Sequence, residues 1–145
     1  MTILLNCDVG ESFGNWSLGN DKRVLKHVDL ASVACGSHAG DPRVIDRTVR
    51  RAIKNNVVIG AHPSYEDLNG FGRRSIKLSS KELKLSLLYQ IGALKEITLA
   101  AGGTVCYVKP HGALYNDMMS KDQILLDIME AVIQSLPEGK LVILY

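Results

Sequence analysis

Short apolar runs alternate with longer amphipathic stretches along the whole chain, and no other feature constrains the fold as strongly. This alternation predicts βαβ units around a parallel sheet, because parallel strands are joined by crossover helices. The fold class is therefore α/β. Five strands are predicted, over Ile3–Cys7, Leu30–Ala34, Val57–Ala61, Thr104–Val108 and Leu141–Leu144.

The stretches between the predicted strands carry helix start and stop signals. Asp41 can cap the first long helix, and Ser79 with Glu82 has the spacing of a capping box before the second. Ser120 is predicted to cap the third. The helices are expected over Pro42–Asn56, from Ser80 to before Gly102, from after Ser120 to before Pro137, and, as a short element, over Asp21–His27. The side chains predicted to face inward are Ile45, Val49, Ala52, Ile53, Leu83, Leu87, Ile91, Leu94, Ile97, Ile124, Leu125, Ile128, Met129, Val132 and Ile133.

Composition narrows the class of protein further. With 145 residues, 46% hydrophobic and 22% charged, the chain is typical of one globular domain, residues 1–145. Its net charge of +2 comes from scattered residues, which predicts no nucleic-acid-binding face. The longest apolar run, Leu141–Tyr145, is too short to span a membrane, and the first residues lack a signal-peptide pattern, so we expect a cytoplasmic protein. Cys7, Cys35 and Cys106 are predicted to be reduced, buried thiols.

Polar segments directly follow the first four predicted strands, at residues 8–11, 36–41, 62–65 and 109–112. Because the carboxyl ends of parallel strands lie on one face, these segments are expected to meet at one mouth, where α/β folds carry their active sites. One histidine after a strand is usually a loop residue, but its repetition at equivalent positions predicts a function. The side chains expected there are Asp8, Glu11, His38, His62, Lys109 and His111. His27 is expected on the surface of a helix.

Two kinds of chemistry fit these residue types. Asp8 and Glu11 can ligate a divalent cation together with histidines, with Asp8, His38 and His62 as candidate ligands, since carboxylate and imidazole suit zinc, manganese or iron. They can equally act as general base and acid on a substrate. Their spacing in the sequence does not choose between these roles. Lys109 can orient a carboxylate or phosphate as a point charge, or project into solvent.

A second polar motif, Gly70-Phe71-Gly72-Arg73-Arg74, lies in a long connection before the capping box. Its glycines allow close backbone approach, and Arg73 and Arg74 can hold an anion such as a carboxylate or a phosphate. A solvated basic turn is the alternative. Cys7 and Cys35 lie near the predicted mouth and are expected to be small core residues rather than nucleophiles.

Together these motifs resemble the LamB/YcsF lactam-utilisation family. The matching segments are Asn6–Gly14, Ala34–Pro42, Ile59–Tyr65, Gly70–Arg74, Tyr89–Leu94 and Val108–Asn116, which occur in the family's order over nearly the whole chain. The resemblance implies a distorted, TIM-like barrel of parallel strands and helices, related to the sugar deacetylases. Ser37 stands where the family usually has an aromatic residue.

The resemblance also implies an activity. Members of the family supply the A subunit of the ATP-dependent 5-oxoprolinase, which opens 5-oxo-L-proline to L-glutamate with subunits B and C as partners. Carried onto this chain, the family's polar cluster matches Asp8, Glu11, His38, His62, Lys109 and His111. The implied mechanism activates the lactam carbonyl by phosphorylation. Water positioned by Asp8 or a histidine then opens the ring, while Lys109 or an arginine holds the substrate carboxylate.

The family continues well beyond residue 145, and an eightfold barrel typically needs about 250 residues. The expected barrel is therefore incomplete, with about five strands, and the domain is truncated relative to the family. The strand Leu141–Leu144 is expected to present an unpaired edge. We expect either a fragment or a chain that covers this edge by association, for example as a homo-oligomer.

Two other functions are compatible with the same residues. One is a metal-dependent, deacetylase-like hydrolase of N-acyl sugars, by analogy of fold and of the Asp and His cluster. The other is a catalytically silent, truncated module that only binds a ligand or a partner.

Overall fold

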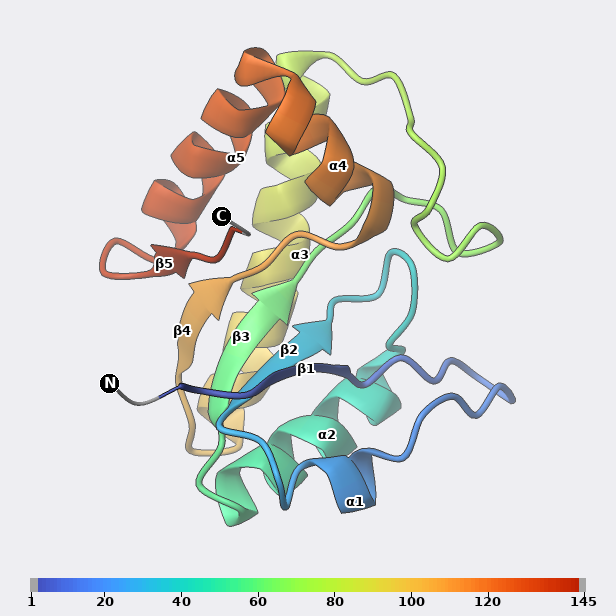
Figure 1. Cartoon of the computed structure of the whole chain (residues 1–145), viewed down its shortest axis with the longest axis vertical. Coiled ribbons are helices and arrows are strands. Elements are labelled where there is room, and N and C mark those ends of the chain that lie inside the picture. The colour runs from blue at the N-terminus through green and yellow to red at the C-terminus, as the bar shows by residue number, and fades with distance from the viewer. Residues whose placement is uncertain (1–2, 144–145) are drawn as a thin grey trace.

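The computed structural model describes residues 3–143 and contains one parallel sheet with helices packed on it (Figure 1). The five strands lie in the order β1-β2-β3-β4-β5, each parallel to its neighbours. β1 and β5 form opposite edges, so the sheet is not closed into a barrel. The strands are β1 (Asn6–Val9), β2 (Leu30–Ala34), β3 (Val58–His62), β4 (Val105–Val108) and β5 (Lys140–Leu141). The helices are α1 (Asp21–Val24), α2 (Pro42–Lys54), α3 (Ser80–Ala100), α4 (Gly112–Ser120) and α5 (Asp122–Ser135).

One face of the sheet carries the hydrophobic core. Side chains in register across the strands, such as Val33 and Ala61, are fully buried there. They belong to one apolar cluster with Val49 of α2 and Ile91 of α3. Helix α3 is the central helix of this layer, since it contacts both α2 and α5. Burial of these apolar faces fixes the sheet against the helices and sets the positions of the loops at the strand ends.

The other face of the sheet carries the ring of Tyr107, which lies near the polar side chains of Asn6 and Ser32. The Tyr107 hydroxyl lies 3.1 Å from Ser32 Oγ and accepts a hydrogen bond from the Asn6 side chain at 3.1 Å. Its ring lies over Gly60, where an added Cβ would come within 2.2 Å of ring atoms. The sequence therefore needs glycine at residue 60 so that β3 can accommodate the tyrosine of β4.

Helix α2 and the capping box of α3 are as predicted from the sequence. The Asp41 side chain accepts hydrogen bonds from the amides of Arg43 and Val44, and Ser79 and Glu82 form both bonds of the box. Strand β2 has the predicted bounds, and β1, β3 and β4 overlap their predicted ranges.

The predicted cap at Ser120 is wrong. Ser120 is the last residue of α4, a helix that the sequence analysis did not anticipate. Helix α4 begins at Gly112, which has a positive φ of 56°, and its N-cap residue His111 makes no capping hydrogen bond through its side chain. It therefore lacks the usual start signal. Helix α5 then starts at Asp122 without a side-chain cap.

Two further expectations need correction. Met129 and Ile133 of α5, predicted to face inward, are 42% and 62% exposed, because α5 packs through the narrower stripe of Ile128, Ala131 and Val132. Of the three cysteines only Cys35 is buried; Cys7 is half-buried and Cys106 is exposed. All three are free thiols, and burial raises the pKa of Cys35 to about 12, as expected for a core residue rather than a nucleophile.

The last predicted strand is only partly described. β5 comprises Lys140 and Leu141, and the Val142 amide continues the pairing by donating to the carbonyl of Val108 at 2.8 Å. Leu144, the last residue of the predicted strand, lies outside the described residues, as does Tyr145. Within residues 3–143, no helix is long and apolar enough to cross a membrane.

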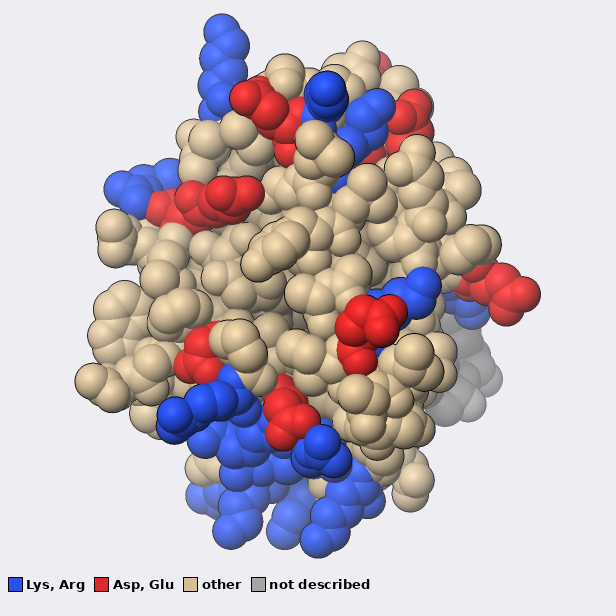
Figure 2. Space-filling model, turned by 180° about the vertical axis from the view of Figure 1, so that it is seen from behind, with Lys and Arg blue, Asp and Glu red and all other residues tan. Residues whose placement is uncertain are grey.

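The basic side chains are less scattered in the fold than along the sequence. Lys and Arg gather at the end of the molecule formed by α1 and α2 (Figure 2). These two helices contain Lys22, Arg23, Arg43, Arg47, Arg50, Arg51 and Lys54.

Candidate active site

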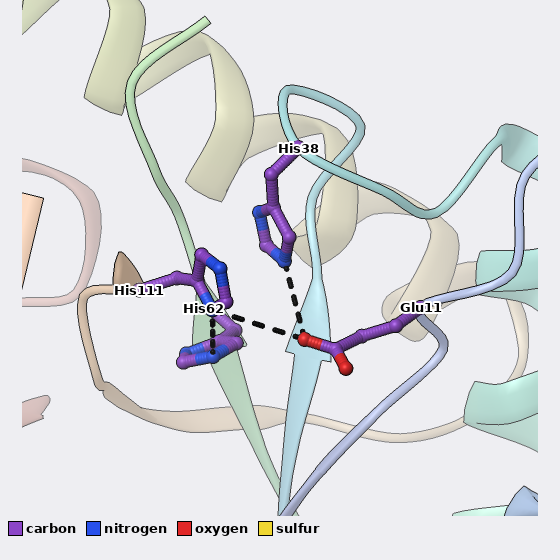
Figure 3. Close-up of side chains that lie close together, drawn as sticks. All are labelled: Glu11, His38, His62 and His111. Atoms are coloured by element: carbon purple, nitrogen blue, oxygen red, sulfur yellow. Dashed lines mark hydrogen bonds and ion pairs between the residues drawn. The ribbon is translucent and has the colours of Figure 1, made fainter. Parts of the chain in front are cut away.

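Four segments far apart in the sequence meet at the carboxyl ends of β1 to β4. Glu11 follows β1, His38 lies in the loop after β2, His62 is the last residue of β3, and His111 follows β4 (Figure 3). One ligating atom of each of these four residues lies within 4.8 Å of those of the other three. We call this group the His-Glu cluster. Its three imidazoles are buried, and Glu11 is half-buried.

The inner atoms of the His-Glu cluster face one another closely. His62 Nε2 lies 3.0 Å from His111 Nδ1. Glu11 Oε1 lies 3.5 Å from His38 Nε2 and 3.8 Å from His111 Nδ1. The four side chains therefore converge on one small volume, as Figure 3 shows.

The outer nitrogen of each imidazole is held by a different segment. His62 Nδ1 donates to the carbonyl of Lys109 at 2.5 Å, and His111 Nε2 donates to that of Phe71 at 2.8 Å. His38 Nδ1 lies 3.0 Å from Ser64 Oγ. These contacts fix the orientation of each ring.

The ring of Phe71 meets the rings of His38 and His111 edge-on. The next residue, Gly72, has a positive φ of 65°, and a Cβ there would lie 2.9 Å from both His38 Cβ and His111 Cδ2. Glycine is thus required on conformational and steric grounds, and it lets this loop close over the histidines.

Burial favours the neutral form of His38 and His111. It lowers the pKa of His111 to about 4, with a further contribution from the neighbouring His38 and His62. It also lowers the pKa of His38, although the Glu11 carboxylate opposes that shift. Near neutral pH, these two rings therefore carry a lone pair rather than a second proton.

Asp8 and Lys109 form an ion pair beside the cluster. Lys109 Nζ lies 2.5 Å from Asp8 Oδ1, and His62 Nε2 lies 3.4 Å from Asp8 Oδ2. Burial alone would raise the pKa of Asp8, but the neighbouring His62 and the hydrogen bond and charge of Lys109 bring it far below its ordinary value. Asp8 is therefore ionised near neutral pH.

A cavity of about 470 Å³ opens next to this ion pair. Its polar lining residues include Asp8, Lys109, His62, His111 and Arg73. Its less polar lining residues include Pro110, Ala113, Tyr115, Val142 and Ile143. This volume is within the range of small-molecule sites.

The two arginines of the Gly-rich motif have different surroundings. Arg73 lines the cavity, with its guanidinium carbon 5.6 Å from the centroid of the Phe71 ring. Arg74 forms hydrogen bonds and an ion pair with the Asp67 carboxylate, which also accepts from the Gly70 amide. Of the pair, Arg73 is the one in reach of a ligand in the cavity.

The structure thus brings all six of the side chains expected at the mouth into one region, with Asp8 and Lys109 beside the cavity and Glu11 and His38 deeper in the cluster. His27 is exposed just after α1.

The role of Gln90 in this region was not predicted from the sequence. The buried Gln90 side chain makes hydrogen bonds with the backbone of Ser64, the residue behind His38. The sequence did contain a signal for this role, because Gln90 is a polar residue at an inward position of the apolar stripe of α3.

Comparison with known proteins agrees with this geometry. Residues 3–145 match the model of the LamB/YcsF family. A protein of Pseudomonas fluorescens (strain Pf-5), named as the A subunit of 5-oxoprolinase, is 57% identical over 130 residues, which cover 90% of this chain and 52% of that protein. A protein of the same name from Vibrio cholerae is 53% identical over 131 residues, covering 90% of this chain and 53% of the relative.

The crystal structure of a lactam utilization protein from Thermus thermophilus superimposes with a TM-score of 0.97 at 42% sequence identity. The match covers 99% of this chain and 58% of that protein, so the chain spans about half the length of the relatives it matches. The predicted TIM-like, deacetylase-related fold is thus matched over its first five strands, in an open sheet. From its motifs, its fold and these matches, the chain belongs to the LamB/YcsF family.

Proposed function

We propose that this chain takes part in the ring-opening hydrolysis of 5-oxo-L-proline to L-glutamate, as the A subunit of an ATP-dependent 5-oxoprolinase. The observation that carries the proposal is the ionised Asp8, held by Lys109 at the wall of a cavity that suits a small, anionic amide. The names of relatives that are 53% and 57% identical to the chain support the same substrate.

The lining of the cavity matches the two halves of this substrate. Lys109 and Arg73 are the cations within the lining, and either can bind the substrate carboxylate. The ring methylenes would pack against apolar lining residues such as Ala113 and Ile143. The lactam group would then lie near Asp8 and His62, where the remaining polar groups are.

The chemistry follows from these positions. Transfer of the γ-phosphoryl group of ATP to the lactam oxygen gives ADP and makes the carbonyl carbon a better electrophile. Asp8 accepts a proton from a water molecule as the water oxygen adds to that carbon, and the C–N bond then breaks with a proton going to nitrogen. This leaves an acyl phosphate, and a second water molecule hydrolyses it to release inorganic phosphate and leave the new carboxylate of glutamate. Lys109 stabilises the negative charge that develops on the carbonyl side.

ATP and the partner subunits B and C belong to this proposal. Arg73 is the proposed contact for a phosphate of ATP or for the substrate carboxylate, and Arg74 would act only if it left Asp67. The relatives are named as one lettered subunit of 5-oxoprolinase, which is the basis for expecting partner chains. A homo-oligomer that covers β5 stays a further prediction.

A second candidate function is the removal of the acyl group from N-acyl sugars. The His-Glu cluster favours it, because histidine and carboxylate ligands are typical of metal-assisted amide hydrolysis. Both candidates cleave an amide bond. They differ in the need for ATP and in the product released.

The test is an assay of the purified chain, combined with subunits B and C, for release of L-glutamate and ADP from 5-oxo-L-proline and ATP. We expect Asp8→Asn and His111→Ala to abolish turnover, and His27→Ala, an exposed control, to keep it. Full turnover by the first two variants would overturn the assignment. Acetate release from an N-acetyl sugar without ATP, in place of glutamate release, would establish the second candidate.

A further inference from the structure

The hydrogen atoms of the three cluster imidazoles can be placed from their outer partners. A backbone carbonyl can only accept a hydrogen bond, so His62 must carry its hydrogen on Nδ1, toward Lys109, and His111 must carry its hydrogen on Nε2, toward Phe71. The inner atoms, His62 Nε2 and His111 Nδ1, are then lone pairs when the rings are neutral. These two acceptors lie 3.0 Å apart.

The same reasoning applies to His38. The hydroxyl of Ser64 has one hydrogen, and it donates this hydrogen to the carbonyl of Tyr65 at 2.8 Å. Ser64 Oγ can therefore only accept from His38 Nδ1, which leaves the lone pair on His38 Nε2. That nitrogen is fully buried, makes no hydrogen bond, and faces the carboxylate oxygen of Glu11 at 3.5 Å.

Four electron-pair donors thus face one another with no hydrogen between them. Lone pairs at these distances repel, and burying them without a partner costs free energy. One added proton can bridge only one pair. A proton between His62 and His111, for example, still leaves His38 Nε2 facing Glu11 Oε1. A single cation at the centre contacts all four donors at once.

We propose that Glu11, His38, His62 and His111 bind one transition-metal dication of the Zn²⁺ type. Three imidazoles and one carboxylate suit Zn²⁺, Fe²⁺ or Co²⁺ rather than Mg²⁺ or Ca²⁺, which prefer oxygen ligands. Ligands about 2.0–2.1 Å from a tetrahedral zinc lie roughly 3.3 Å from one another. Three of the six separations, 3.0, 3.5 and 3.8 Å, lie around this value, and all six lie within 4.8 Å.

This ligand set differs from the one expected from the sequence. Asp8 was a candidate ligand together with His38 and His62. It pairs with Lys109 and, although its Oδ2 lies 3.4 Å from His62 Nε2, it is not among the four residues whose ligating atoms all lie within 4.8 Å of one another. Glu11 and His111 complete the set instead. Asp8 stays available for proton transfer on the cavity side.

The outer partners of the histidines are those of a metal site. Metal-bound histidines usually donate their other ring N–H to a carbonyl or a similar acceptor, which orients the ring and fixes its tautomer. Here the carbonyls of Phe71 and Lys109 and the hydroxyl of Ser64 have this role. A bound metal would supply Lewis acidity toward an amide carbonyl. That role rests on the proposed function, whereas the binding itself does not.

The experiment measures metal binding directly. The full chain is treated with a chelator, desalted, and titrated with ZnCl₂ by calorimetry and with CoCl₂ by visible absorption. We expect one equivalent of either metal to bind, with the intense visible bands of low-symmetry Co²⁺ and an increase in Tm on addition of Zn²⁺. Glu11→Gln and His38→Ala should each weaken Zn²⁺ binding by more than about 100-fold, beyond the loss typical of an outer partner.

Two variants serve as controls. His27→Ala should keep the affinity and the Co²⁺ spectrum, and Asp8→Asn, which changes a neighbour of His62 but no ligand, should still bind one equivalent of metal. Glu11→Gln preserves the shape of the half-buried side chain, so circular dichroism is expected to report the normal fold. Absence of saturable binding at one equivalent would overturn the proposal. Unchanged affinity in Glu11→Gln, or loss of binding in Asp8→Asn, would overturn this ligand set.

The outcome is separate from that of the proposed function. Tight Zn²⁺ binding without any glutamate release would support the metal site and contradict the 5-oxoprolinase assignment. Glutamate release by the chelator-treated, metal-free protein would support that assignment and contradict a catalytic role for the metal.

Discussion

The imidazole rings of His38 and His111 lie stacked in parallel, with their centroids 3.8 Å apart and 3° between their planes. They come from the loops after β2 and β4, which are two strands apart in the sheet. Gly72, in a third loop, lies against both side chains, next to the His111 ring and the His38 Cβ. The stack therefore depends on a backbone approach that only glycine permits.

Gly72→Ala should disrupt this stack. The added Cβ would lie 2.9 Å from atoms of both histidines, and φ at this residue is positive, so we expect a loss of about 1–3 kcal/mol in the free energy of unfolding. Urea denaturation measures this loss. Gly14→Ala is the matched control, because Gly14 also has a positive φ, of 53°, but a Cβ there would meet nothing within 4 Å. Equal losses in both variants would show that backbone strain alone matters.

Lys109→Met should raise the pKa of Asp8. The lysine is one of the two groups, with His62, that bring this pKa below its ordinary value against the effect of burial. Without Lys109, the effect of burial, which raises the pKa of Asp8, is less opposed. Carbon-13 NMR of the Asp8 carboxyl group follows the titration. Lys54→Met, at the exposed end of α2, should leave the titration unchanged, and no shift in Lys109→Met would contradict the ion pair.

Gln90→Leu should destabilise the protein and loosen His38. The Gln90 side chain accepts from the Ser64 amide at 3.0 Å and donates to the Ser64 carbonyl at 2.9 Å, all in a buried environment. Leaving these groups unpaired should cost about 1–3 kcal/mol for each group. Thermal unfolding measures the cost, and Gln134→Leu, exposed near the end of α5, is the control. A change within about 0.5 kcal/mol, as at an ordinary surface site, would contradict this role.

Asp67→Asn should reduce the loss of stability in acid. The Arg74 guanidinium lowers the pKa of Asp67 below its model-peptide value of 3.8. A carboxyl group with a lowered pKa in the folded state stabilises that state above the unfolded pKa, and this contribution is lost as the pH falls through the folded pKa. The stability of the wild type should therefore fall more steeply below pH 3.8 than that of the variant. Urea titrations at neutral and acid pH compare the two, and parallel curves would contradict the prediction.

Much of the fold could be predicted from local patterns. The capping box at Ser79 and the cap at Asp41 act within one helical turn, so the sequence alone identifies the starts of α2 and α3. Helix α4 could not be found this way. It starts at Gly112 after a residue without a capping bond, and the Gly112 region is held instead by the distant Gly72, whose carbonyl accepts from the Ala113 amide at 2.9 Å.

The sequence by itself determined which residues would gather. Alternating strands and helices force the carboxyl ends of parallel strands to one side, so Asp8, His62 and Lys109 had to come near one another. Only the tertiary structure decided how their atoms face. Asp8 pairs with Lys109, while Glu11 and His111 converge with His38 and His62. This happens because distant loops supply the carbonyls and the glycine that orient the rings. Such contacts between loops leave no periodic pattern in the sequence.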